Sequence, residues 1–171
     1  MNKIKAFIFD WGDTVMRDFP EYSGPMAYWP RVEPVKDIDV VLKYLQPDIT
    51  CCLASNAGDS DSELMGAALS RVNLRQYFRY LFTSHELGVK KPDPAFYCEI
   101  MRRIELKPEQ CVAVGNDYNK DIVPAKSTGM ITILFSQSAQ STVTSCADYT
   151  IDSMDKLVPV IKKLKNKMNK G

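Results

Sequence analysis

Short apolar runs alternate along the chain with segments whose apolar residues recur at helical spacing. The runs at residues 6–9, 50–54, 77–83, 111–114 and 131–135 are typical of strands buried on both faces, and residues 149–151 predict a last short strand. The segments at residues 34–45, 94–104 and 154–164 predict helices with one apolar face, and two further helices are expected, one that runs to about residue 70 and one that ends near Gly129. This alternation predicts an α/β fold, with a parallel sheet of about five strands and helices on both of its faces.

Two of the predicted helices begin with capping residues. Ser60 and Glu63 have the spacing of a capping box, which favours a helix that runs to about residue 70. Asp93 followed by Pro94 is typical of an N-cap and a first helical position. Both signals indicate where the chain leaves a loop and enters a helix.

Residues 16–33 lack any periodicity and carry several aromatic residues among prolines and a glycine. They predict a long irregular loop, and such loops in compact domains are usually functional or flexible. We expect Tyr22, Tyr28 and Trp29 either to line the entrance to a site, to form a contact between subunits, or to pack on the core. The polar run at residues 136–145 predicts a second loop.

The length of 171 residues predicts a single domain over residues 1–171. The net charge of +1 gives no reason to expect nucleic acid or an anionic membrane as a partner. No apolar run approaches the roughly 20 residues that span a bilayer. The amino terminus leads straight into a strand without the features of a signal peptide, which favours a cytoplasmic location.

The metal-binding and redox-active residue types are few. The five cysteines, an odd number without metal-ligand spacing, are Cys51, Cys52, Cys98, Cys111 and Cys146. We expect them to be small core residues in a reducing compartment, forming neither disulfides nor a zinc site. His85 is the sole histidine, which excludes a site with two histidine ligands, and we expect it at the surface. The sequence contains neither a glycine-rich dinucleotide motif nor a P-loop, which argues against those chemistries.

Polar side chains of complementary type follow the predicted strands. They are Asp10, Ser55 with Asn56, Lys91, and the group formed by Asn116, Asp117 and Asp121. Ligands of open α/β sheets bind at the carboxyl ends of the strands, so we expect these side chains to converge. Carboxylates from separate strands suit a hard cation, most simply Mg²⁺. A metal and a lysine together neutralise a phosphoryl group, and a carboxylate that remains free can attack its phosphorus.

Four motifs carry a resemblance to a known family. They are FDWGDT at residues 9–14, LASN at 53–56, GVKKPDP at 88–94 and VGNDYNKD at 114–121. The motifs occur in the same order as in the haloacid dehalogenase superfamily, which the chain therefore resembles. Members of that superfamily are hydrolases with an aspartate nucleophile. The resemblance implies a Rossmann-like three-layer sandwich with the strand before Asp10 at its centre.

The same resemblance implies roles for the site residues. Asp10 would form a phosphoaspartyl intermediate in a phosphatase that requires Mg²⁺. Ser55 with Asn56 would bind the phosphorylated substrate, and Lys91 would hold both the nucleophile and the developing charge. The loop at residues 116–121 would bind the metal together with Asp10, and which of Asn116, Asp117 and Asp121 contacts it directly is left open.

Two positions depart from the family pattern. Phosphatases of this family usually carry a general acid and base two positions after the nucleophile, and here that position is Gly12. The Gly12 carbonyl can still bind the metal, and Asp13 is the nearby carboxylate that we expect to substitute as a catalytic group. Asn116 stands where a metal-binding aspartate is usual. These changes predict slow hydrolysis that favours aryl or acyl phosphates, because a missing general acid typically costs about 10²–10⁴ in rate.

The segments that could hold a cap domain are short. Residues 16–33 are too few for a helical cap of the usual size, so this loop stands in its place and we expect an open, minimal-cap active site. An open site suits a large or protein-borne phosphorylated substrate, or a site closed by a second subunit through loop 16–33.

Three other classes of protein remain as alternatives. Gly12 and Asn116 also fit a catalytically weak or inactive relative that binds a ligand. A signalling receiver domain uses similar residues, but there the acceptor aspartate follows the third strand and the acidic pair follows the first. A relative acting on a carbon–phosphorus or carbon–halogen bond would not need the second aspartate.

Overall fold

The computed structural model describes residues 3–56, 58–137 and 145–169, and its centre is a six-stranded parallel sheet. The strands are β1 (Ala6–Phe9), β2 (Thr50–Ser55), β3 (Tyr80–Thr83), β4 (Cys111–Gly115), β5 (Ile131–Phe135) and β6 (Tyr149–Ile151). Their order is β3-β2-β1-β4-β5-β6, so β1 lies between β2 and β4. Asp10, which follows β1 directly, therefore lies in the middle of the carboxyl edge of the sheet. The predicted α/β fold with this strand at its centre is confirmed.

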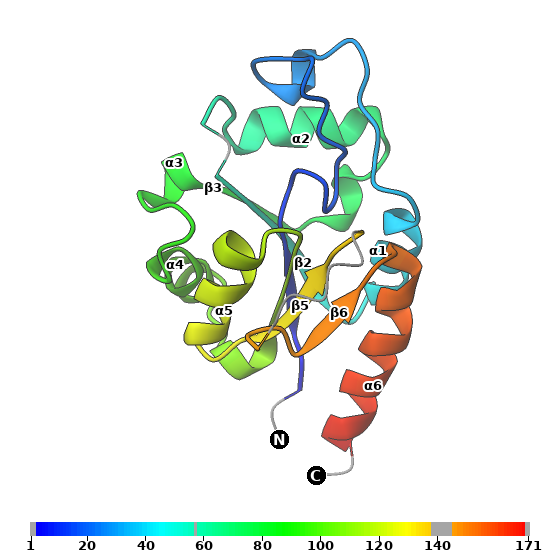
Figure 1. The fold of residues 1–171 in the computed structure, drawn as a ribbon, viewed down its shortest axis with the longest axis vertical. Coiled ribbons are helices and arrows are strands. Elements are labelled where there is room, and N and C mark those ends of the chain that lie inside the picture. Colours follow the sequence, from blue (N-terminus) through cyan, green and yellow to red (C-terminus); the bar gives the residue numbers. More distant parts are fainter. Residues whose placement is uncertain (1–2, 57, 138–144, 170–171) are drawn as a thin grey trace.

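Helices cover both faces of the sheet (Figure 1). They are α1 (Ile38–Leu45), α2 (Ser62–Arg71), α3 (Ser84–Leu87), α4 (Ala95–Arg103), α5 (Val123–Ser127) and α6 (Leu157–Asn169). Successive strand residues point to opposite faces: Phe7 packs with the apolar side chains of α1, α2 and α6, and Ile8 packs with those of α3, α4 and α5. The predicted Rossmann-like three-layer sandwich is confirmed. Among the described residues, no helix has the length and apolar character that crossing a bilayer requires.

Several element boundaries differ from the prediction. α1 begins at Ile38 and not near Pro34, because Pro34 instead forms an isolated antiparallel bridge with Met16. The capping box predicted for α2 is wrong: the Asp61 carboxylate, and not Ser60, accepts a backbone N–H in the first turn. Moving the N-cap from Ser60 to Asp61 changes the stability of the helix little, because carboxylate and hydroxyl caps are nearly equivalent.

Other predicted features fall close to their expected places. The Asp93 carboxylate accepts the Ala95 N–H at 2.9 Å, at the start of α4. The third strand is shorter than predicted because residues 75–77 form a 3₁₀ turn before it. Cys51, Cys52 and Cys111 are buried as expected, whereas Cys98 is exposed and Cys146 is half-buried, so the expectation of a core position is wrong for Cys98. The predicted loop at 136–145 lies mostly outside the described residues, which omit 138–144.

Loop 16–33 packs beside α2, with its 3₁₀ turn η1 (Met26–Tyr28) at the top of Figure 1. The buried Trp29 ring packs against Phe19 and Tyr22, with ring centroids 6.5 and 5.5 Å away. The Arg71 guanidinium on α2 donates to three loop carbonyls, those of Ala27, Trp29 and Pro30. Of the three aromatic residues singled out in the loop, Trp29 and Tyr22 thus follow the core-packing alternative, whereas Tyr28 is 74% exposed.

Candidate active site

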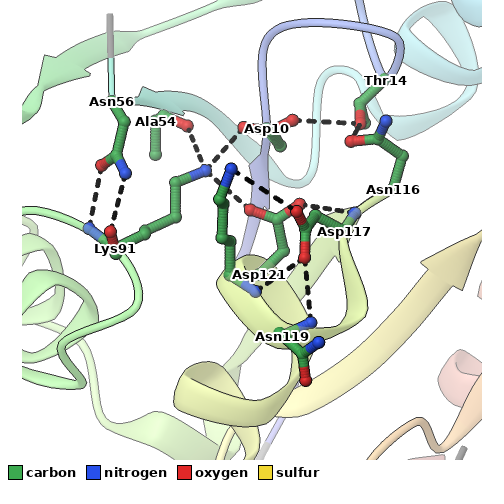
Figure 2. Close-up of polar contacts among 10 residues, drawn as sticks. Asp10, Thr14, Ala54, Asn56, Lys91, Asn116, Asp117, Asn119 and Asp121 are labelled. Carbon is green, nitrogen blue, oxygen red and sulfur yellow. Dashed lines mark hydrogen bonds and ion pairs between the residues drawn. The ribbon is translucent and has the colours of Figure 1, made fainter.

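The Lys91 ammonium group joins three separate segments at the carboxyl edge of the sheet (Figure 2). Its Nζ donates to Asp10 Oδ1 at 2.6 Å, to Asp121 Oδ1 at 2.7 Å and to the Ala54 carbonyl at 3.2 Å. These contacts use all three ammonium protons. Lys91 is only 4% exposed, and a buried cation persists only when it is paired in this way. The structure therefore brings together Asp10, Lys91 and Asp121, which lie far apart in the sequence.

The charges of this cluster are set by burial and by one another. Burial alone would lower the pKa of Lys91, but the neighbouring carboxylates, Asp10 above all, raise the pKa of Lys91 above its ordinary value. The ammonium therefore stays protonated at neutral pH. Burial, reinforced by the charge of Asp10 and opposed by Lys91, raises the pKa of Asp121 to about 6. The Lys91 cation is thus shared between Asp121 and Asp10.

Asn56 determines where the Lys91 backbone lies. Its Nδ2 donates to the Lys91 carbonyl at 2.8 Å, and its Oδ1 accepts the Lys91 N–H at 2.8 Å. Both polar ends of the Asn56 side chain are thus engaged with the Lys91 backbone, and Asn56 also lines the cavity, where its predicted contact with substrate stays a prediction. Ser55, at the end of β2, is buried and lines the same cavity as Lys91.

Asp121 is held in a short π-helical turn, η4 (Tyr118–Ile122), that follows β4. Its N–H donates to the Asp117 carbonyl at 2.8 Å, and its Oδ2 accepts the Asp117 N–H at 3.0 Å. The side chain lies directly against Gly115, where an added Cβ would come within 2.4 Å of the Asp121 Cβ. A glycine at the end of β4 is therefore what lets Asp121 reach Lys91.

Among the described residues, two side-chain oxygens of the predicted metal ligands have only long contacts. Asp10 Oδ2 and Asn116 Oδ1 both lie 3.4 Å from the hydroxyl of Thr14, which is fully buried. Both oxygens of Asp121 are engaged, and the Asp117 carboxylate caps the following turn. Sequence reasoning missed Thr14, although its place four residues after Asp10 on the same turn was a usable signal.

The oxygen atoms that line this site can be compared with the ligands that Mg²⁺ prefers. Within residues 3–56, 58–137 and 145–169, no group of three or more His, Cys, Asp or Glu side chains is arranged to hold a metal ion. A cation here must therefore also use neutral oxygens, and Asn116 and the Gly12 carbonyl supply that type. Mg²⁺ accepts one or two carboxylates completed by other oxygens and waters, so the residues fit it. Asp10, the Gly12 carbonyl and Asn116 would be the protein ligands of such an ion, and Asp117 and Asp121 line the same cavity.

The cluster lines a cavity of about 390 Å³. Its walls are Asp10, Gly12, Asp13, Asp18, Ser55, Asn56, Lys91, Asn116, Asp117, Lys120 and Asp121. A second cavity of about 540 Å³ shares Asp13 and Asn116 with it and is also lined by Arg17 and Lys36. None of the loop aromatic residues lines either cavity. All the residues predicted for the site therefore meet at one edge of the sheet.

The sheet order and the Asp10–Lys91 ion pair together define an α/β protein with a paired carboxylate at the centre of its site. The model of the haloacid dehalogenase-like hydrolases matches residues 17–129, a range that contains Ser55, Lys91 and Asn116. The chain belongs to the haloacid dehalogenase-like hydrolase family, which confirms the predicted membership. The motif around Asp10 precedes the matched range. The receiver-domain alternative is thereby set aside.

Relatives and solved structures agree with this assignment. The chain is 37% identical over 99 residues to the glyceraldehyde 3-phosphate phosphatase of Methanocaldococcus jannaschii, covering 57% of this chain and 43% of that protein. It is 27% identical over 145 residues to the ribulose-1,5-bisphosphate 5-phosphatase of Halopiger xanaduensis, covering 79% and 59%. The HAD-hydrolase YfnB of Bacillus subtilis has the same fold, with a TM-score of 0.75 at 13% identity over 92% of this chain and 98% of that one. The chain thus spans about half the length of the curated relatives it matches.

Proposed function

We propose that this protein is a Mg²⁺-dependent phosphatase in which the Asp10 carboxylate attacks phosphorus. The observation that carries this proposal is the 2.6 Å ion pair between Asp10 and Lys91, which both line the cavity. A cation that binds one oxygen of the nucleophile also stabilises the negative charge that develops on a phosphoryl group attached there. The phosphatase names of the two curated relatives support the same reaction class.

Each residue of the cavity has its own role in the proposed reaction. An Asp10 oxygen forms a bond to phosphorus as the bond from phosphorus to the leaving oxygen breaks, which gives a phosphoaspartate. Lys91 and the Ser55 hydroxyl stabilise the charge on the transferring group, and Asn56 keeps Lys91 in place. Bound Mg²⁺, held by Asp10, Asn116 and the Gly12 carbonyl, would supply further charge neutralisation. Water then attacks the phosphoaspartate, which releases phosphate and restores Asp10.

The second cavity suggests the class of substrate. It adjoins the first at Asp13 and Asn116 and carries two basic residues, Arg17 and Lys36. We propose that the phosphoryl group lies at Asp10 while the rest of a small phosphorylated molecule occupies this second cavity. Residues 1–171 would act as one catalytic domain, with loop 16–33 in place of a cap. A protein-borne substrate and a homo-oligomer through loop 16–33 remain predictions.

Phosphate release from a panel of phosphoesters tests this function. The panel contains acetyl phosphate, 4-nitrophenyl phosphate and several sugar phosphates, each with MgCl₂ and with EDTA. We expect release that depends on Mg²⁺, is abolished by Asp10→Asn and is unchanged by Asp155→Asn, an exposed aspartate outside the site. Absence of turnover on the whole panel would favour the inactive, ligand-binding alternative. Full activity of Asp10→Asn would exclude Asp10 as the nucleophile.

A further inference from the structure

We propose that Asp18 is a catalytic residue that gives a proton to the leaving oxygen, the role for which Gly12 has no side chain. This inference rests on the proposed phosphatase function. Asp18 lines the same cavity as Asp10 and Lys91. A Cβ built on Gly12 would lie 3.9 Å from the Asp18 Cβ and 4.0 Å from its Oδ2. The Asp18 carboxyl group therefore occupies the neighbourhood that a side chain at position 12 would reach.

A tight turn brings Asp18 back over Gly12. The Trp11 carbonyl accepts the N–H groups of Val15 and Met16, each at 3.0 Å. Asp13 adopts a left-handed conformation with a φ of 54°, which is an uncommon conformation outside glycine and reverses the chain. Gly12 and Met16 then form a bridge, so the residues that follow Met16 run beside the start of the turn.

Backbone hydrogen bonds to Glu33 and Val35 hold the far end of this turn. The Val15 carbonyl accepts the Val35 N–H at 2.9 Å, and the Arg17 N–H donates to the Glu33 carbonyl at 2.9 Å. The Asp18 N–H donates to Asp13 Oδ1 at 3.0 Å. The backbone that leads into Asp18 is therefore held by two N–H groups, those of Arg17 and Asp18, and the Asp18 side chain lies at the cavity wall.

The two candidate carboxylates differ in what they already bind. Asp13 Oδ1 is engaged by the Asp18 N–H, which gives Asp13 a positioning role. The Asp18 carboxylate has no hydrogen-bond or ion-pair partner in the part of the chain that the structure describes. A carboxyl group that faces a reaction cavity without a partner is available for proton transfer. Asp18 thus replaces Asp13, which the sequence predicted as the substitute.

The proton transfer fits into the reaction without another reactant. As Asp10 attacks, the bond from phosphorus to the leaving oxygen breaks, and that oxygen takes the proton of the Asp18 carboxylic acid and leaves as an alcohol. Asp18 is then a carboxylate. It accepts a proton from the water that attacks the phosphoaspartate, so phosphate is released and both aspartates return to their starting states.

Leaving-group dependence in the first turnover tests this role. Rapid-quench experiments measure release of the alcohol or phenol from an alkyl phosphate and from 4-nitrophenyl phosphate, whose leaving group departs without a proton. We expect Asp18→Asn to slow alkyl release by about 10²–10⁴ while aryl release stays within roughly threefold of wild type. Asp155→Asn is the matched control and should release both groups at wild-type rates.

A rescue variant tests whether the loss of alkyl release in Asp18→Asn is the loss of a proton donor. A Cβ added at Gly12 meets only ordinary contacts, so the backbone there leaves room for the start of an aspartate side chain. We expect Gly12→Asp combined with Asp18→Asn to recover alkyl release. If Asp18→Asn slows both substrates equally or neither, or if the rescue fails, Asp18 is not the acid, while the loss of activity in Asp10→Asn would still support the proposed function. Wild-type protein inactive on both substrates would overturn both proposals.

Discussion

The side-chain amide of Asn56 and the backbone of Lys91 form a closed pair of hydrogen bonds, each 2.8 Å long. This pair joins the end of β2 to the loop before α4. It fixes the backbone from which the Lys91 side chain reaches Asp10 and Asp121, so the geometry of the ion-pair cluster depends on a residue that contacts neither carboxylate.

Replacing Asn56 with alanine should therefore weaken both folding and catalysis. Two hydrogen bonds are lost, each with a net contribution of about 1 kcal/mol, so we expect the free energy of unfolding to fall by about 2 kcal/mol. Because Lys91 loses its position while the substrate cavity stays, kcat should fall more than KM changes. Urea unfolding and steady-state kinetics measure these effects, with Asn119→Ala, at an exposed position, as the control. A variant with raised KM and normal kcat would instead indicate that Asn56 binds substrate.

Gly115 should tolerate no side chain. The Cβ of Gly115→Ala would lie 2.4 Å from the Asp121 Cβ and force that side chain away from Lys91. Overpacking of this kind typically costs about 1–3 kcal/mol of stability, and we expect activity to be lost as well. Gly58→Ala is the matched control because no atom lies within 4 Å of its added Cβ. Equal stability of the two variants in thermal unfolding would contradict the packing that we describe.

Mg²⁺ binding should depend on Asn116 more than on the acidic residues behind it. Its side-chain oxygen has one contact, at 3.4 Å, whereas both Asp121 oxygens are engaged. In calorimetric titrations of protein stripped with EDTA, we expect Asn116→Ala to weaken Mg²⁺ binding at least about tenfold, which corresponds to 1.4 kcal/mol. Asn119→Ala should bind as wild type does. Normal affinity in Asn116→Ala together with lost affinity in Asp117→Asn would assign the ligand to Asp117.

Asp148 should make stability depend on acid pH. Burial would raise the pKa of Asp148, but hydrogen bonds from Lys126 and Thr132 outweigh it and hold that pKa below its ordinary value. Stability from a lowered pKa is present above the unfolded value, near 4, and is lost as the pH falls through the folded value. Asp148→Asn should cost about 1 kcal/mol at pH 7, since exposure screens the ion pair. Urea unfolding should show this difference shrinking below about pH 4; a constant difference would contradict it.

The order of the strands and the meeting point of the site residues were predictable because both follow from simple rules. Buried runs such as 6–9 and 111–114 are too short and too apolar for surface helices, and parallel strands carry their following residues to one edge. The family motifs added the central place of β1. The sequence therefore predicted correctly that four side chains lie together at the carboxyl edge of the sheet, those of Asp10, Ser55, Lys91 and Asp121.

What the sequence left open depends on chain turns and side-chain bonds that motifs do not encode. Asp18 lies outside the FDWGDT motif, and it reaches Gly12 only because Asp13 adopts a positive φ and Met16 returns to bridge Gly12. The periodicity of hydrophobic residues does not predict a turn of this kind. Likewise, Asn56 follows Ser55 in the sequence like a second substrate ligand, and only the structure shows that Lys91 engages both of its polar ends.

Trapping the covalent intermediate tests the central claim most directly. Wild-type protein is mixed with acetyl phosphate or 4-nitrophenyl phosphate and Mg²⁺, quenched in acid within the first turnover and reduced with borohydride, which converts an aspartyl phosphate into homoserine. Peptide mass spectrometry should find homoserine at position 10, and none in Asp10→Asn or without Mg²⁺. Phosphate release with the reduced residue at any other position, or undiminished release by Asp10→Asn, would contradict the account.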